Sequence, residues 1–240
     1  MSSRQEEKER RRQERLAAEQ EAAKVSARKQ RLGIAGGAVL AVAIVAAIVI
    51  AVTGGGSSKR KTPLTPQGKT AAIPAVQQQD LNKAVAAAGC KLRTFIPGSN
   101  DRSHVTGKVH YKQNPPVFGP HNPTPAHDGD YVGQGAPPTE MLVHAMEHGR
   151  IEIQYAPGTP ARRQSQLETL MNEQFSGKPV GYKELLFQNE TKMPFAVAAT
   201  AWGQQLGCPA FNDKVFDALR AFRAKFVDQA PEGAAIPYPE

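Results

Sequence analysis

Cysteine and aromatic residues are scarce in this chain, which has two cysteines, one tryptophan and 6% aromatic residues among 240 positions. So few cysteines exclude a disulfide-dense miniprotein. The sequence also lacks the C-x-x-C, G-x-S-x-G, G-x-G-x-x-G and Walker patterns. These absences disfavour thiol oxidoreductases, serine hydrolases, dinucleotide-dependent enzymes and NTPases.

Charge is missing altogether from residues 33–53, which read GIAGGAVLAVAIVAAIVIAVT. As a helix this stretch spans roughly 31 Å, which matches the hydrocarbon core of a bilayer. We therefore expect a single transmembrane helix here. A buried core helix and a cleaved signal peptide are the alternatives. The long leader and the lack of an A-x-A cleavage pattern after the apolar run argue against a signal peptide.

Residues 1–32 have the opposite composition, with ten Lys or Arg, six Glu and almost no large apolar residues. Basic residues next to the apolar run, such as Arg28 and Arg31, favour a cytoplasmic N-terminus. We expect a charged, partly disordered cytoplasmic tail on a plasma-membrane protein whose C-terminal part is extracytoplasmic. The glutamates and the lack of interleaved aromatic residues argue against nucleic-acid binding.

The remaining segments follow from composition. Gly33, Gly37 and Ala41 recur at four-residue spacing and form a candidate homodimer face of the spanning helix. Residues 54–79 are rich in Gly, Ser and Pro, which is typical of a flexible linker. We expect an exported α/β domain over residues 80–232, followed by a tail over residues 233–240.

The two cysteines are Cys90 and Cys208. Outside the cytoplasm, an isolated pair is most simply one disulfide bond. Closing a loop of about 118 residues would stabilise the fold by about 5 kcal/mol in the chain-entropy description. A redox pair and two free thiols are the alternatives.

The order of the expected elements points to a fold class. Alternating strands and helices from residue 108 onward give the order strand, helix, strand, helix, strand, strand, helix. This order predicts an α/β (α+β) domain with a thioredoxin-like mixed sheet, built from a βαβ and a ββα unit. After a first short helix that ends at Gly89, we expect strands at 108–111, 151–155, 182–187 and 195–202, and helices at 139–148, after Thr159-Pro160 and after Asn212 or Asp213.

Histidine is concentrated between positions 104 and 148, where all six residues of this type lie. On a helix, His144 and His148 share one face and Glu147 lies beside that face. The proline-rich loop at 114–121 is stiff and can hold His121 near them. Three imidazoles, or two and a carboxylate, suit Zn²⁺ or Cu²⁺. We expect a transition metal or a small ligand to bind at His121, His144 and His148, with Glu147 either as a further ligand or as a residue that orients a histidine. His127 or His110 could take the place of His121.

Two other interpretations of this segment stay open. The pattern His144-x-x-Glu147-His148 also fits the H-x-x-E-H zinc hydrolases, in which the glutamate activates water. The early helix end at Gly149 argues against that enzyme class. Alternatively, the histidines serve packing alone, since His148 is favoured at a helix C-terminus by the helix dipole. The protein would then be a non-catalytic structural or interaction module of the cell envelope.

Two motifs stand out in this region: Asn114-Pro115-Pro116 with Gly119-Pro120-His121, and Leu142-Val143-His144 with Glu147-His148-Gly149. They resemble a bacterial family of exported or membrane-anchored proteins described as a domain of unknown function. That family has the pattern N-P-P-x-S-G-P-H followed by L-V-H-x-L-E-H-G, and the resemblance covers about residues 85–230. One departure is Phe118, where the family has a small hydroxyl residue. The resemblance implies location and architecture, and it implies no activity.

Overall fold

The computed structural model describes residues 71–236 and residue 238. Their strands form a six-stranded mixed sheet with the order β1-β6-β5-β3-β4-β2. Strand β4 runs parallel to both β3 and β2, whereas the pairs β3–β5, β5–β6 and β6–β1 are antiparallel. The strands are β1 (Lys91–Thr94), β2 (Gly129–Asp130), β3 (Ile151–Tyr155), β4 (Glu184–Gln188), β5 (Val197–Ala201) and β6 (Gln204–Cys208).

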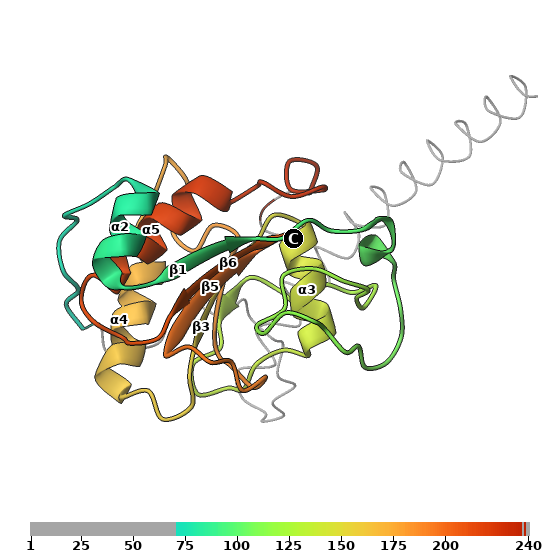
Figure 1. The fold of residues 1–240 in the computed structure, drawn as a ribbon, viewed down its shortest axis with the longest axis horizontal. Coiled ribbons are helices and arrows are strands. Elements are labelled where there is room, and N and C mark those ends of the chain that lie inside the picture. The colour runs from blue at the N-terminus through green and yellow to red at the C-terminus, as the bar shows by residue number, and fades with distance from the viewer. Residues whose placement is uncertain (1–70, 237, 239–240) are drawn as a thin grey trace, which may run out of the picture. The chain divides into compact units, whose positions relative to one another are not determined.

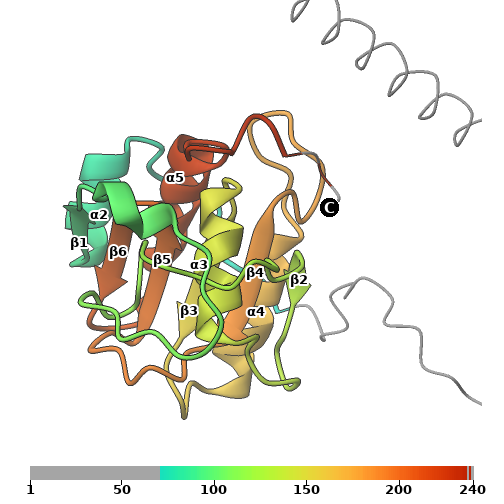
Figure 2. The ribbon, with the colours of Figure 1, turned by 90° about the vertical axis from the view of Figure 1, so that its right-hand side faces the viewer.

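Four α-helices in the described part of the chain cover the two faces of this sheet. Helices α2, α4 and α5 lie on one face, and α3 lies on the other face with the long loop that precedes it (Figures 1 and 2). The result is a three-layer arrangement, and the expected mixed α/β class is confirmed. The helices are α2 (Leu81–Ala88), α3 (Thr139–Glu147), α4 (Ala161–Met171) and α5 (Val215–Phe226), and a 3₁₀ turn spans Ser99–Arg102.

Local sequence signals account for α2 and α5, two of the three helices that share one face of the sheet. The Asp80 side chain accepts a hydrogen bond from the Lys83 backbone N–H at 2.9 Å and caps α2. Gly89, at φ 70°, ends the same helix in the left-handed conformation. In α5, Phe216 and Phe222 are fully buried. Apolar residues at helical spacing therefore give α5 one face that packs on the sheet.

The two faces of the sheet differ in character because side chains alternate along each strand. Ile151 and Ile153 of β3 belong to the main apolar core with α2, α4 and α5. Glu152 and Gln154, the residues between and after them, are buried against the layer that contains α3, and Thr200 of β5 lies with them. The sheet therefore has an apolar face under three helices and a partly polar face under α3 and its loop.

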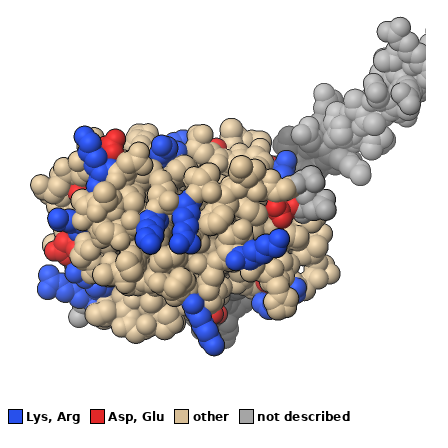
Figure 3. All heavy atoms as spheres, in the orientation of Figure 1, with Lys and Arg blue, Asp and Glu red and all other residues tan. Residues whose placement is uncertain are grey.

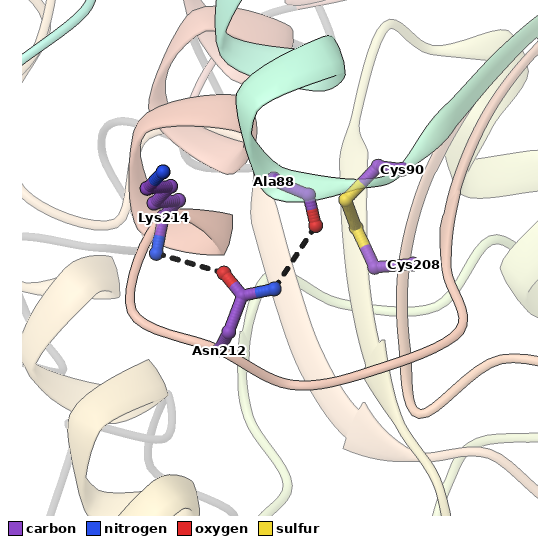
Figure 4. The surroundings of a disulfide bond; sticks show 5 residues. All are labelled: Ala88, Cys90, Cys208, Asn212 and Lys214. Carbon is purple, nitrogen blue, oxygen red and sulfur yellow. Dashed lines mark hydrogen bonds between the residues drawn. A yellow bond between two sulfur atoms is a disulfide. The ribbon is translucent and has the colours of Figure 1, made fainter.

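The expected disulfide bond is confirmed between Cys90 and Cys208. It joins the residue before β1 to the last residue of β6, at a Cα–Cα distance of 4.2 Å (Figure 4). Nearby, the Asn212 side chain donates to the Ala88 carbonyl at 3.0 Å and accepts from the Lys214 N–H at 3.0 Å. The end of α2 and the start of α5 are therefore tied together beside the disulfide.

The first described residues lie along α4 and α5. The backbone N–H groups of Gln77 and Gln78 donate to the Asp217 carboxylate of α5. The side chains of Gln166 and Thr169 in α4 donate to backbone carbonyls of residues 71–72. Residues 71–79, at the end of the segment expected as a linker, are thus held by hydrogen bonds.

The strand expected at residues 108–111 is wrong. There, Lys108 is exposed and the Val109 N–H donates to the Glu140 side chain at 3.0 Å instead of to a neighbouring strand. The short strand before α3 is β2. Two further strands, β1 and β6, were not expected. The β6 sequence Gln-Gln-Leu-Gly-Cys lacks the β-branched and aromatic residues that signal a strand.

Within residues 71–236, no helix is long and apolar enough to cross a membrane. The transmembrane helix expected at residues 33–53 lies outside the described residues, as do the charged leader and the candidate dimer face. On the surface drawn in Figure 3, basic side chains are spread across the face and do not form one patch.

Candidate metal centre

Helix α3 provides two of the clustered side chains. His144 and Glu147 are three residues apart, so they project from the same side of the helix, and they are 4% and 2% exposed. The helix ends where Gly149 adopts φ 81°. A Cβ atom at Gly149 would lie 2.8 Å from the Cα atoms of Asp228 and Gly233, so only glycine fits this turn.

The loop before α3 supplies two histidines. His104 and His121 form an isolated parallel β-bridge. In this bridge, the Val105 N–H donates to the His121 carbonyl at 2.8 Å and the His121 N–H donates to the Ser103 carbonyl at 3.0 Å. The two rings are 5.1 Å apart between centroids. The bridge therefore fixes both histidines at one place over α3.

His104, His121, His144 and Glu147 form one group that could hold a metal ion. Each residue offers one ligand atom, and these atoms all lie within 4.8 Å of one another. The His144 ring lies 4.7 Å from the His121 ring and 4.8 Å from the His104 ring. His104 is exposed and the other three are buried, so the group reaches solvent at His104.

Backbone carbonyls orient two of the imidazoles. The Nδ1 atom of His121 lies 2.8 Å from the Gly119 carbonyl, and the Nδ1 atom of His144 lies 2.7 Å from the Asn122 carbonyl. A carbonyl oxygen only accepts hydrogen bonds, so each Nδ1 atom carries the proton. The lone pair of each neutral ring is then on Nε2, which is the arrangement found around ligating histidines.

The Nε2 atom of His121 lies 3.0 Å from Oε2 of Glu147. This pair does not have the geometry of a hydrogen bond, and the fully buried Nε2 atom has no hydrogen-bond partner among the residues that the structure describes. With the proton on Nδ1, two acceptor atoms face each other in the buried part of the group. Leaving buried acceptors in this state is costly, and a cation between them would remove the cost.

Burial also controls the protonation of the rings. Burial, together with the smaller effects of the neighbouring rings of His148, His121 and His104, lowers the pKa of His144 to about 4, against a hydrogen bond to Asn122 that raises it. Burial likewise lowers the pKa of His121, although Gly119 and Glu147 act in the opposite direction. Both imidazoles are therefore neutral at pH 7, the form that binds metal ions.

Arg102 contacts the group from outside and was not anticipated from the sequence. Its Nε atom donates to Oε1 of Glu147, and its Nη2 atom donates to Oε1 of Glu232 at 2.8 Å. The hydrogen bond to Glu147 raises the pKa of Arg102. Arg102 thereby holds one carboxylate oxygen of Glu147 and leaves the other facing His121.

The other expected ligands are not members of this group. His148 stacks edge-on against His144 at 4.4 Å between centroids, and its Nε2 atom lies 3.5 Å from Oε2 of Glu232. It is not one of the four clustered residues. His127 and His110 are exposed and are also outside the cluster.

His104 is the member that sequence reasoning missed. It stands well before the proline-rich loop and outside any expected strand or helix, so no periodicity connects it to His121. Its membership depends on the β-bridge, a tertiary contact. The only signal in the sequence was its place among the six clustered histidines.

The fold and the cluster together define a class: a mixed α/β domain with one disulfide and a largely buried histidine–glutamate group. The family described as "Protein of unknown function (DUF3105)" matches residues 104–237. Because this match covers more than half of the chain, the protein belongs to that family. No curated protein and no solved structure matches the chain.

Proposed function

We propose that this chain is a single-pass membrane protein whose exported domain binds one transition-metal ion through His104, His121, His144 and Glu147. The observation that carries the proposal is the facing pair of acceptors, His121 Nε2 and Glu147 Oε2, which are 3.0 Å apart and buried. A metal ion with a positive charge satisfies both atoms at once.

The set of donors favours Zn²⁺ or Cu²⁺. Three imidazoles and one carboxylate supply the four nitrogen and oxygen ligands that Zn²⁺ takes in closed sites, and imidazole also suits Cu²⁺. Bonds of about 2.0–2.1 Å place tetrahedral ligand atoms roughly 3.4 Å apart. The ligand atoms lie within 4.8 Å of one another, so binding shortens the longest separation by up to roughly 1.4 Å. The exposed His104 is the residue most free to make this movement.

The geometry supports binding more than hydrolysis. A catalytic zinc keeps one coordination position open for water, whereas four protein ligands fill a tetrahedral site. Glu147 contacts Arg102 and faces His121, so it is placed as a ligand and not as a base next to a metal-bound water. A metal-dependent hydrolase would lose its activity in Glu147→Gln, which tests this second reading directly.

A structural role without metal is the main alternative. The carbonyl contacts of His121 and His144, together with the pair between Arg102 and Glu147, would hold the loop on α3 without any ion. In this case, metal would neither copurify with the protein nor stabilise it. An interaction module of the cell envelope would then be the better description.

The membrane location rests on the uncharged residues 33–53 and on the basic residues that precede them. The thioredoxin-like interpretation of the exported domain is supported by the strand order β6-β5-β3-β4. Helix α4 connects the parallel strands β3 and β4, and α5 follows the β5–β6 hairpin. These are a βαβ unit and a ββα unit around one mixed sheet.

The experiment is metal analysis of the full chain, purified in detergent without a histidine tag. We expect about one zinc or copper ion per chain, and a rise in melting temperature when the metal-stripped protein is given Zn²⁺ or Cu²⁺. His144→Ala and Glu147→Gln should lose the metal, whereas His110→Ala and His127→Ala, which change exposed histidines outside the group, should keep it. A metal-free protein whose melting temperature ignores both ions would remove the proposal.

A further inference from the structure

A cavity of about 260 Å³ lies on the other side of α3 from the histidine cluster. Helix α3 contributes Leu142 and Met146 to its wall. These residues are two positions before and two positions after His144, so they project from the opposite face of the helix. None of the four clustered residues lines this cavity. The two sites are therefore separate, although they share one helix.

The floor of the cavity includes the polar face of β3. Glu152 and Gln154 line it, and they are only 1% and 2% exposed. Oε2 of Glu152 accepts hydrogen bonds from the Gln154 side chain at 3.0 Å and from the Thr200 hydroxyl at 2.9 Å. Asn189 donates to Oε1 of Gln154 at 2.7 Å and fixes that amide. The Gln154 amide and the Thr200 hydroxyl therefore both donate to the same Glu152 oxygen, Oε2.

The other oxygen of Glu152, Oε1, is fully buried and has no hydrogen-bond partner among the described residues. Lys108 also lines the cavity, but its ammonium group lies 3.5 Å from Glu140 and is exposed. Burial without a cationic partner raises the pKa of Glu152 to about 8. The cavity therefore contains a buried carboxyl oxygen that lacks a donor.

The remaining walls have an apolar part and a polar part. The apolar part includes Leu142, Met146, Phe187 of β4 and Pro116 of the proline-rich loop. The polar part consists of Thr139, Asn189, Glu190 and Thr191. A cavity of this size is at the lower limit of ligand pockets, which typically measure about 300–1,000 Å³. It therefore suits a molecule with a short hydrocarbon body and one polar group.

We propose that this cavity binds a small organic amine, whose ammonium group displaces the Glu152 proton to solvent and donates to the resulting carboxylate, while its hydrocarbon part packs against Leu142, Met146 and Phe187. The group that the cavity lacks is a hydrogen-bond donor, and a donor with a positive charge compensates a buried carboxylate better than a neutral one does. The apolar part of the wall favours a ligand that carries a hydrocarbon body.

The test is calorimetric titration of the full-length protein with n-butylammonium, in matched detergent buffer. We expect saturable binding at one site, weakened at least tenfold in Glu152→Gln. n-Butanol, an uncharged molecule with the same four-carbon body, should bind at least tenfold more weakly than the amine. Ala136→Phe, which adds a bulky ring to the cavity wall and leaves Glu152 in place, should also abolish binding.

Several outcomes would overturn the proposal: no saturable heat in the wild type, equal affinity in Glu152→Gln, or equal affinity for the alcohol. The melting temperature of each variant shows that it is folded. His144→Ala, which removes a proposed metal ligand, should bind the amine as the wild type does. Failure of the metal site and failure of the amine site are thereby distinguished.

Discussion

His104 lies beside His121 because the backbones of the two residues pair in a short parallel bridge, which sets their rings 5.1 Å apart. One of these histidines is exposed and the other is fully buried. A cation can therefore reach the cluster from the side of His104 without opening the apolar core. The bridge therefore places two loop histidines in the group that we propose as a metal site.

The first prediction separates two histidines at the edge of this cluster. His104→Ala should weaken Zn²⁺ affinity by about 100-fold or more, because it removes a residue that binds the metal directly. Losing a residue that only supports a ligand typically weakens affinity by about 10- to 100-fold. His148→Ala should weaken affinity less, because His148 lies next to Glu232 and outside the group of four. Competition with a chromophoric chelator measures both affinities. A larger loss in the His148 variant would contradict the assignment of ligands.

The second prediction concerns the disulfide. Replacing both Cys90 and Cys208 with alanine should lower the free energy of unfolding by about 2–5 kcal/mol, because the unfolded chain gains the freedom of a long open loop. Urea unfolding followed by the fluorescence of Trp202, the only tryptophan, measures the loss. Reducing agent should produce the same loss in the wild type and no change in the double variant.

The third prediction concerns the pH dependence of stability through Glu152. Burial raises its pKa to about 8 from an ordinary value near 4.5, so the folded protein keeps a proton that the unfolded chain releases. Its contribution to stability is complete below pH 4.5 and falls as the pH rises to 8, by an amount on the order of 3–5 kcal/mol. Glu152→Gln should therefore be more stable than the wild type at pH 8 and no more stable at pH 4.5.

Comparing the wild type with Glu152→Gln isolates the contribution of Glu152 to the pH dependence of stability, because the other buried acids titrate equally in both. Burial raises the pKa of Glu184 to about 7 and that of Asp130 to about 6. Tyr111, whose pKa is raised by burial and by the charges of Glu140 and Glu152, titrates above this range. Denaturant unfolding curves at several pH values give the difference in the free energy of unfolding between the wild type and the variant. A flat difference between pH 4.5 and 8 would show that Glu152 does not hold the proton.

The fourth prediction compares two glycines with nearly the same backbone conformation. Gly149 has φ 81° and Gly158 has φ 80°. A Cβ atom at Gly158 meets nothing within 4 Å, whereas one at Gly149 meets the backbone of Asp228 and Gly233 at 2.8 Å. Gly158→Ala should cost about 1–2 kcal/mol from conformation alone, and Gly149→Ala clearly more. Equal melting temperatures for the two variants would show that the turn after α3 can move.

Much of the fold could be predicted from periodicity. Helices α3, α4 and α5 and strands β3, β4 and β5 lie where alternating or helical apolar patterns placed them. Strands β1 and β6 were missed because they depend on pairing with a neighbour and carry few strand-forming side chains. The strand expected at 108–111 is absent, and the Val109 N–H there donates to the Glu140 side chain of α3 instead of to a strand.

The candidate site was predictable only where one element contains it. His144 and Glu147 follow from helical spacing, and the stiff loop indicated His121. His104 and Arg102 come from a β-bridge and a 3₁₀ turn whose positions over α3 are set by tertiary packing. The cavity next to Glu152 could not be predicted, because its walls come from α3, from β3 and β4, and from loops far apart in the sequence. Only the folded structure brings them together.

The covalent link between Cys90 and Cys208 also has a mechanical consequence. A pulling force applied to the chain before α2 passes along α2 to Cys90, and the disulfide bond then transmits it to Cys208 at the end of β6. The four-residue edge strand β1 is therefore shielded from unzipping, since the load bypasses its hydrogen bonds and is delivered to the interior of the sheet.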